Sequence, residues 1–279
     1  MKHMPENKHY LPNLDNVSIL AAVIILAYTL PHFVSLPPWQ IEIQVLGVYI
    51  PIILDFSTII AILITGLTAT GAVWLLHDHP HLEKNQIIVQ HWLLPSLTAL
   101  VLWLSIEQLP FGGQWWIVAS ASGIVLMLVL VAEYIVLAHD NPYYIPASIG
   151  ITAISLSLFL ILAVALHAAE VRLFFRVPAL SFAAGLVLLR IIYLRAQGKW
   201  AFKEAIIVFF LVGELAAGLH YWPIKSITFG IALLGLTYAI VELSENLLAP
   251  EPKTLFQTIL GPILVLAIAW GVAFALGGG

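Results

Sequence analysis

Three charged residues lie within long apolar stretches of the sequence: Glu133, Arg190 and Glu242. A charged side chain near the centre of a membrane-spanning helix costs about 2.5 kcal/mol or more, so such residues face a partner or a water-filled interior. We therefore expect the chain to pack so that these charges meet. Two chemistries fit this pattern: a pathway for protons or a charged solute, and internal ion pairs that hold helices together.

The ionisable residues sort by predicted depth into two layers. In the first layer His91 joins Glu133, Arg190 and Glu242, each about one to two turns, or roughly 5 to 10 Å, inside the end of its stretch. We expect this layer to line the path, or to form the structural ion pairs. A second polar layer lies toward the opposite ends of the stretches and contains Asp55, Glu107, His167, Glu170, Glu214 and His220.

Glu214 differs from the rest of the second layer, because it stands in the segment GELAAG among small residues. Small residues let helices approach closely, so we expect this carboxylate to be buried and to belong to the path. The others in its layer are interpreted either as path residues or as interfacial groups in contact with water. Small residues also recur at 65–71, 120–123 and 148–157, where helix packing is the main interpretation and a polar cavity lining the alternative.

The elements that must position these residues are membrane-spanning helices. Apolar residues make up 61% of the 279-residue chain and charged residues 9%, whereas about a quarter of the residues of a soluble domain are charged. Mean hydropathy is +1.01. We predict an all-α polytopic membrane bundle whose nine spans cover 17–34, 51–76, 87–108, 115–138, 145–167, 177–196, 203–221, 225–247 and 255–276. The connections are short, so successive helices should be antiparallel neighbours.

The segment 35–49 interrupts the helical pattern after the first span. Residues 41–45 alternate apolar and polar side chains, and Leu46-Gly47 offers a turn before a second apolar run. This pattern predicts a small extracytoplasmic hairpin or interfacial element outside the lipid core. A surface cap is the simpler interpretation, and a gate over a pore is the alternative.

Basic residues orient the predicted bundle. With nine spans the two termini lie on opposite sides, and the N-terminal side collects Lys2, Lys8, Lys84, Arg195, Lys199, Lys203 and Lys253. The other side holds only Arg172, Arg176 and Lys225. The positive-inside rule then predicts a cytoplasmic N-terminal segment, 1–16, followed by one multi-span domain, 17–279, with an extracytoplasmic C-terminus.

Histidines raise the question of a metal or haem. Imidazole and carboxylate ligands suit zinc, copper or iron, and the segment HDHPHLEKN contains His77, Asp78, His79 and His81. Pro80 and the polar composition favour instead a water-facing turn that leads into the next helix. Haem needs axial ligands on facing helices, and the pairs to test are His167 with His220 and His91 with His139. We predict no cofactor and keep metal or haem at these histidines as an alternative.

Several activities have no residues to support them. The chain contains no cysteine, which excludes disulfides, iron-sulfur clusters and thiol catalysis. It lacks the P-loop, zincin and serine-hydrolase motifs. A net charge of −4 without a basic face excludes nucleic acid as a partner. No span shows a Gly-Pro interruption at its centre, and we place Pro178 and Pro262 in first turns, where proline is harmless.

The expected function is that of a permease-like or proton-handling membrane protein whose intramembrane charges line a polar path. A non-catalytic scaffold or accessory subunit of a larger assembly is the alternative, with the same charges as internal pairs. A membrane enzyme acting on lipid is a second alternative, and an enzyme is the less favoured class. Expected partners are membrane lipid and a homo-oligomer or larger membrane complex.

Overall fold

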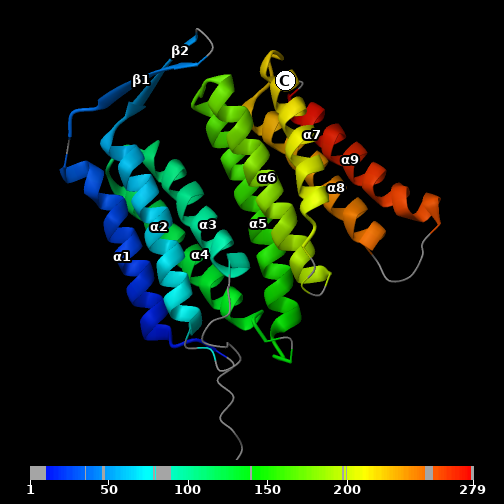
Figure 1. Cartoon of the computed structure of the whole chain (residues 1–279), viewed down its shortest axis with the longest axis horizontal. Coiled ribbons are helices and arrows are strands. Elements are labelled where there is room, and N and C mark those ends of the chain that lie inside the picture. The colour runs from blue at the N-terminus through cyan, green and yellow to red at the C-terminus, as the bar shows by residue number, and fades with distance from the viewer. Residues whose placement is uncertain are drawn as a thin grey trace, which may run out of the picture. The chain divides into compact units, whose positions relative to one another are not determined.

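The computed structural model describes residues 11–34, 36–45, 48–77, 79, 89–138, 140–196, 198, 200–248 and 254–277 of the chain. These residues form nine α-helices and one two-stranded antiparallel sheet (Figure 1). The chain divides into two compact units, Met1–Pro142 and Tyr143–Gly279. The prediction of a single multi-span domain is not tested by this division.

Unit 1 contains four helices and the hairpin. Its elements are α1 (Leu14–Phe33), β1 (Trp39–Val45), β2 (Val48–Leu54), α2 (Phe56–His77), α3 (Val89–Glu107) and α4 (Gly113–Ile135). α1 contacts α2 and α4, and α3 contacts the same two helices. The buried core between them is rich in large side chains, and Tyr28 of α1 donates a hydrogen bond from its hydroxyl to the carbonyl of Ala99 in α3, at 2.9 Å. This bond satisfies a buried phenol that would otherwise be costly.

The predicted hairpin is present between α1 and α2. β1 pairs with β2 in antiparallel register, from Trp39 opposite Leu54 to Val45 opposite Val48, and the predicted turn at 46–47 lies outside the described residues. The second predicted span was wrong at its start, because 51–54 belong to β2 and the helix begins at Phe56. Apolar content does not separate the two elements, because β2 (VYIPIIL) is as apolar as the start of α2.

Glycines of α2 and α4 receive side chains from α1. A Cβ at Gly71 would lie 2.8 Å from Cδ2 of Leu20, and one at Gly123 would lie 3.2 Å from Cγ1 of Ile25. Small residues therefore allow close helix packing at these two positions, as the sequence predicts. In α5 the small polar residues bond to their own helix: Thr152 donates to the carbonyl of Ser148, and Ser155 to that of Ile151.

Unit 2 contains five helices: α5 (Tyr144–Ala168), α6 (Leu173–Arg195), α7 (Phe202–His220), α8 (Ser226–Leu248) and α9 (Leu255–Gly277). α8 is central to the unit, since it contacts α5, α6, α7 and α9. α9 lies along α8 (Figure 1), and only 11% of the most apolar stretch of α9 is buried. Its remaining surface is apolar and suited to lipid.

Seven of the helices in the described part are long and apolar enough to cross a membrane: α1, α2, α4, α5, α6, α8 and α9. This supports a multi-pass membrane protein. α7 has 19 residues but carries Lys203, Glu204 and Glu214. α3 also has 19 residues and contains several polar ones: Gln90, His91 and Glu107. The nine predicted helices are thus confirmed as helices, whereas nine spans remain a prediction.

Replacing Gly71 by Leu should destabilise unit 1, because the new side chain meets Leu20 at a buried contact. Overpacking of this kind costs about 1–3 kcal/mol. Gly66→Leu is the matched control in the same helix, since a Cβ at the exposed Gly66 has no neighbour within 4 Å. Thermal unfolding in detergent should show a lower midpoint for G71L only. Equal midpoints for the two variants would contradict the packing of α1 on α2.

Candidate functional site

A histidine and a glutamate form a buried pair in unit 1. Nδ1 of His91 lies 2.9 Å from Oε2 of Glu133, and the two residues are 5% and 1% exposed. His91 stands in the first turn of α3 and Glu133 in the last turn of α4, so antiparallel helices bring them to one depth. Both residues belong to the first predicted layer. Theirs is the one contact between members of that layer that is established among the described residues.

The surroundings of the pair are aromatic and proline-containing. Pro95 has no N–H group, so it cannot donate the helical hydrogen bond to the carbonyl of His91, four residues earlier. Beside Glu133 on α4, the ring of Tyr134 packs edge-on against His79, with 4.6 Å between the centroids. His79 is buried and so does not face water as predicted, whereas His77 is exposed and 78 and 80–88 lie outside the described residues.

The pair must share at least one proton. A hydrogen bond between an imidazole nitrogen and a carboxyl oxygen needs a hydrogen on one of them, so either Nδ1 of His91 donates or a protonated Glu133 does. The same two groups can hold a second proton, on Nε2 or on the carboxyl. Two titratable groups in hydrogen-bond contact and away from water are suited to binding and releasing protons.

Arg190 lies on α6 in unit 2 and is 3% exposed. Its guanidinium carbon stands 5.9 Å from the ring centroid of Tyr193, which is one turn further along the helix. A cation over an aromatic face is stabilised by the ring quadrupole. Because Glu133 and Arg190 belong to different units, their predicted meeting remains a prediction.

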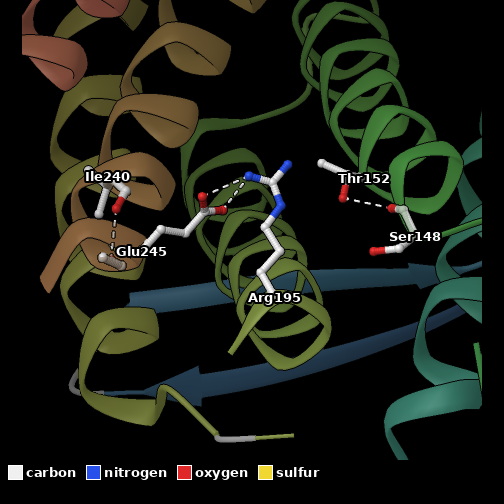
Figure 2. A network of polar contacts seen from close by, with 6 residues as sticks. Ser148, Thr152, Arg195, Ile240 and Glu245 are labelled. Atoms are coloured by element: carbon white, nitrogen blue, oxygen red, sulfur yellow. Dashed lines mark hydrogen bonds and ion pairs between the residues drawn. The ribbon is translucent and has the colours of Figure 1, made fainter. Parts of the chain in front are cut away.

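The sequence leaves open whether Arg190 pairs with Glu133 or with Glu242, and among the described residues no ion pair joins it to Glu242. Among the described residues Glu242 has no ion-pair partner, and its carboxyl group lies against Gly261 of α9. The ion pair that joins α6 to α8 is Arg195 with Glu245, close to the same helix ends (Figure 2). Nη1 of Arg195 donates to both carboxyl oxygens of Glu245, at 2.6 and 2.8 Å. Glu242 and Glu245 are three residues apart, yet they contact different helices.

Glu214 is exposed, which corrects the prediction of a buried carboxylate. The small residues around it do allow close packing: a Cβ at Gly213 would lie 2.7 Å from Oγ of Ser181 on α6, and Ala216 is fully buried. Successive helical residues point about 100° apart. Packing at Gly213 and Ala216 therefore turns the side chain of Glu214 away from α6.

Two second-layer residues of unit 1 have local structural roles. Asp55 precedes α2 and accepts hydrogen bonds from the backbone N–H of Thr58, at 2.8 Å, and from its hydroxyl, at 2.6 Å. It is a helix cap rather than a residue of the span. Glu107, the last residue of α3, accepts a hydrogen bond from the hydroxyl of Ser57. Both carboxylates are exposed.

One second-layer histidine of unit 2, His220, contacts Arg176, a residue that lies just outside the predicted span 177–196. Arg176 lies in the first turn of α6 and is 3% exposed. Its Nη2 donates to the carbonyl of Val171 at 2.9 Å, and its Nη1 donates to Nδ1 of His220 at 3.1 Å. A guanidinium only donates, so Nδ1 of His220 accepts and this imidazole carries its proton on Nε2. Nδ1 of His167 lies 3.1 Å from the hydroxyl of Ser226.

Glu170 closes this cluster through an unusual backbone. At φ +49° it is the one non-glycine residue with positive φ in the described chain. Its N–H bonds to the carbonyl of His167, and the N–H of Val171 bonds to that of Leu166. These two bonds define a Schellman cap at the end of α5, in which glycine is the usual residue at the position of Glu170. The exposed carboxylate acts electrostatically on both His167 and Arg176.

Arg176 was missed because the segment AAEVRLFFR looks like a charged connection. The available signal was the apolar run LFF that precedes Arg176, which continues the helix toward the N-terminus and takes Arg176 into its first turn. The helix begins at Leu173 instead of 177.

Residues 36–276 match the family model of DUF5656, described as a protein of unknown function. The chain belongs to this family. No curated protein and no solved structure matches the chain. The DUF5656 match includes the hairpin and extends into α9, so the His91–Glu133 pair, the Arg176 cluster and Glu242 all lie within it.

The side chains of this DUF5656 protein that could bind a metal or haem have the following contacts. Within the described ranges, no group of three or more histidine, aspartate or glutamate side chains could hold a metal ion. His77 bonds to the carbonyl of Val73 in its own helix. Asp78, His81 and His139 lie outside the described residues. In the first haem pair, Nδ1 of His167 lies next to the hydroxyl of Ser226, and Nδ1 of His220 accepts a hydrogen bond from Arg176.

Replacing Arg176 by Leu should lower the free energy of unfolding by about 1–3 kcal/mol, because the carbonyl of Val171 and Nδ1 of His220 lose their donor. Arg172→Leu is the matched control, since Arg172 is exposed and lies one turn earlier. Exposed substitutions of this kind stay within about 0.5 kcal/mol. Denaturant unfolding of both variants in detergent measures the difference. An R176L protein as stable as R172L would show that the cluster contributes nothing to folding.

Replacing Glu170 by Gly should give a more stable protein than replacing it by Ala. Both variants remove the carboxylate, but only glycine relieves the left-handed backbone, which costs other residues about 1 kcal/mol. The difference in stability between E170G and E170A therefore measures the cost of the left-handed backbone conformation at this position. Thermal unfolding midpoints should rank E170G above E170A, and the reverse order would argue against the Schellman cap.

Proposed function

We propose that the protein is a permease-like membrane protein that handles protons, with His91 and Glu133 as its principal proton-binding pair. The observation that supports this most directly is the 2.9 Å contact between two buried titratable groups on different helices. Seven helices that are long and apolar enough to cross a membrane supply the setting. The pair lies within a few residues of the helix ends, where protons from water have a short distance to travel.

Stability alone is a weak reason for such a pair. Replacing a buried ionic pair by apolar residues of similar volume is often neutral or stabilising, because taking charges out of water is costly. Helix packing in unit 1 is already provided by apolar side chains and by glycine contacts. A pair whose protonation can change offers what an apolar contact cannot, namely a proton held inside the helical bundle.

The proposed path also includes Arg190 and Glu242, the two residues of the first predicted layer that lie in unit 2. Glu214 is left out of it because its side chain is exposed. We further propose that the N-terminus is cytoplasmic and the C-terminus extracytoplasmic, as the basic residues indicate. Membrane lipid is the proposed immediate partner, with self-association or a larger membrane complex as the remaining proposal for protein partners.

Proton flux into proteoliposomes provides the test. Purified protein is reconstituted with a pH-sensitive dye inside the vesicles, and a membrane potential that is negative inside is imposed. Wild-type protein should acidify the interior faster than protein-free vesicles. Glu133→Gln and His91→Gln should each reduce this rate toward that of protein-free vesicles, because each removes a titratable group of the pair. Asp15→Asn is the control, since Asp15 is an exposed carboxylate in the first turn of α1.

Two outcomes would overturn the proposal. Wild-type flux no higher than that of protein-free vesicles would argue for the scaffold or accessory-subunit alternative. Equal flux in wild type and E133Q would show that proton movement does not use the pair. Each variant must first show an unchanged elution profile and unfolding midpoint, so that loss of flux is not loss of folded protein.

A further inference from the structure

The helix α9 contains a Gly-Pro dipeptide that the sequence analysis placed in a first turn. Gly261 and Pro262 are the seventh and eighth residues of α9, well inside the helix. Pro262 cannot donate to the carbonyl of Thr258, four residues earlier, which loses its helical partner. Nδ2 of Asn246 on α8 donates to that carbonyl instead, at 3.1 Å. The two helices are therefore joined at a local interruption of backbone hydrogen bonding.

The carboxyl group of Glu242 occupies the surface that Gly261 leaves bare. A Cβ at Gly261 would lie 3.1 Å from Cδ of Glu242 and on top of Oε1. Glu242 and Asn246 are four residues apart, so they share one face of α8, and both reach the same segment of α9. The carboxyl group is thus held against the backbone of α9 rather than extended toward water, and Glu242 is half-buried.

No neighbouring charge in the described part neutralises this carboxyl group. α9 contributes nothing, because 255–277 contain no ionisable residue. On the elements packed against α8, the titratable groups toward this end are Tyr238 and Glu245 of α8 itself, Tyr144 of α5, Arg190, Tyr193 and Arg195 of α6, and Lys203 and Glu204 of α7. Glu242 makes no hydrogen bond or ion pair with any described residue, and 249–253 lie outside the described part.

We infer that Glu242, with the Gly261-Pro262 interruption of α9, forms a proton-binding site of unit 2. An ionised carboxylate between two apolar helices without a counter-charge is costly, and binding one proton removes that charge. Glu242 does not belong to any group of three or more histidine, aspartate or glutamate side chains in the described part that could hold a metal ion. The inference extends the proposed proton handling to unit 2. It depends on the proposed function only for the route by which the proton reaches Glu242.

Dicyclohexylcarbodiimide is a suitable probe, because it is apolar and reacts only with protonated carboxyl groups. The carboxyl oxygen bonds to the central carbon of the reagent and the carboxyl proton moves to its nitrogen; acyl migration then gives a stable N-acylurea, with no leaving group. The full-length protein in lipid nanodiscs is treated at neutral pH and digested, and modified peptides are quantified by mass spectrometry. Exposed glutamates that lie at helix ends serve as internal controls, for example Glu107 and Glu170.

Wild-type protein should be modified at Glu242 at neutral pH, and the extent of modification should fall as the pH rises. Gly261→Ala places a methyl group where the carboxyl group lies, so it should slow modification severalfold. Gly271→Ala is the matched control in the same helix, because a Cβ there meets nothing within 4 Å. Glu133→Gln should leave modification of Glu242 unchanged, which separates this inference from the proton-flux experiment.

Three results would overturn the inference. The first is an unmodified Glu242 in folded wild-type protein over the pH range in which the exposed glutamates become reactive. The second is equal modification in G261A, G271A and wild type, which would show that the contact with α9 does not hold the group. The third is protection by sodium ions at constant pH, which would assign the site to a metal cation instead of a proton.

Discussion

The cost of leaving a polar group without a partner among apolar helices governs this structure. A proline or charged side chain inside a helix creates such a group, and at three places in the described part a second residue supplies the missing partner. Asn246 supplies the donor that Pro262 lacks, His91 and Glu133 satisfy one another, and Val171 with His220 accepts from Arg176. Polar contacts between helices therefore occur at a few positions, while glycine contacts and large apolar side chains pack the rest.

These positions differ in how readily they exchange protons. The guanidinium of Arg176 stays charged and donates only, so its cluster fixes the turn between α5 and α6. The His91–Glu133 pair and the carboxyl group of Glu242 can instead gain or lose a proton without breaking a helix. This difference separates a structural polar cluster from groups that are suited to proton handling, although all of them are ionisable residues in apolar helices.

Hydropathy alone predicted the nine helices well, because long apolar stretches bounded by polar turns leave few alternatives. Depth along a helix was also predictable, as the meeting of His91 with Glu133 illustrates. The direction of a side chain around its helix was not. Glu214 and Glu242 both stand within predicted spans, yet one is exposed and the other lies against Gly261, since a rotation of about 100° per residue decides which neighbour is met. The hairpin and the early start of α6 required patterns finer than apolar content.

The hydrogen bond from Asn246 to Thr258 has an evolutionary consequence. Asn246 gives the carbonyl of Thr258 the donor that Pro262 cannot supply, so each of the two residues gains from the presence of the other. In descendants and relatives the two positions should change together, and an ordinary residue at 262 should be accompanied by an apolar one at 246. We therefore expect selection on this part of the bundle to act on the pair of residues.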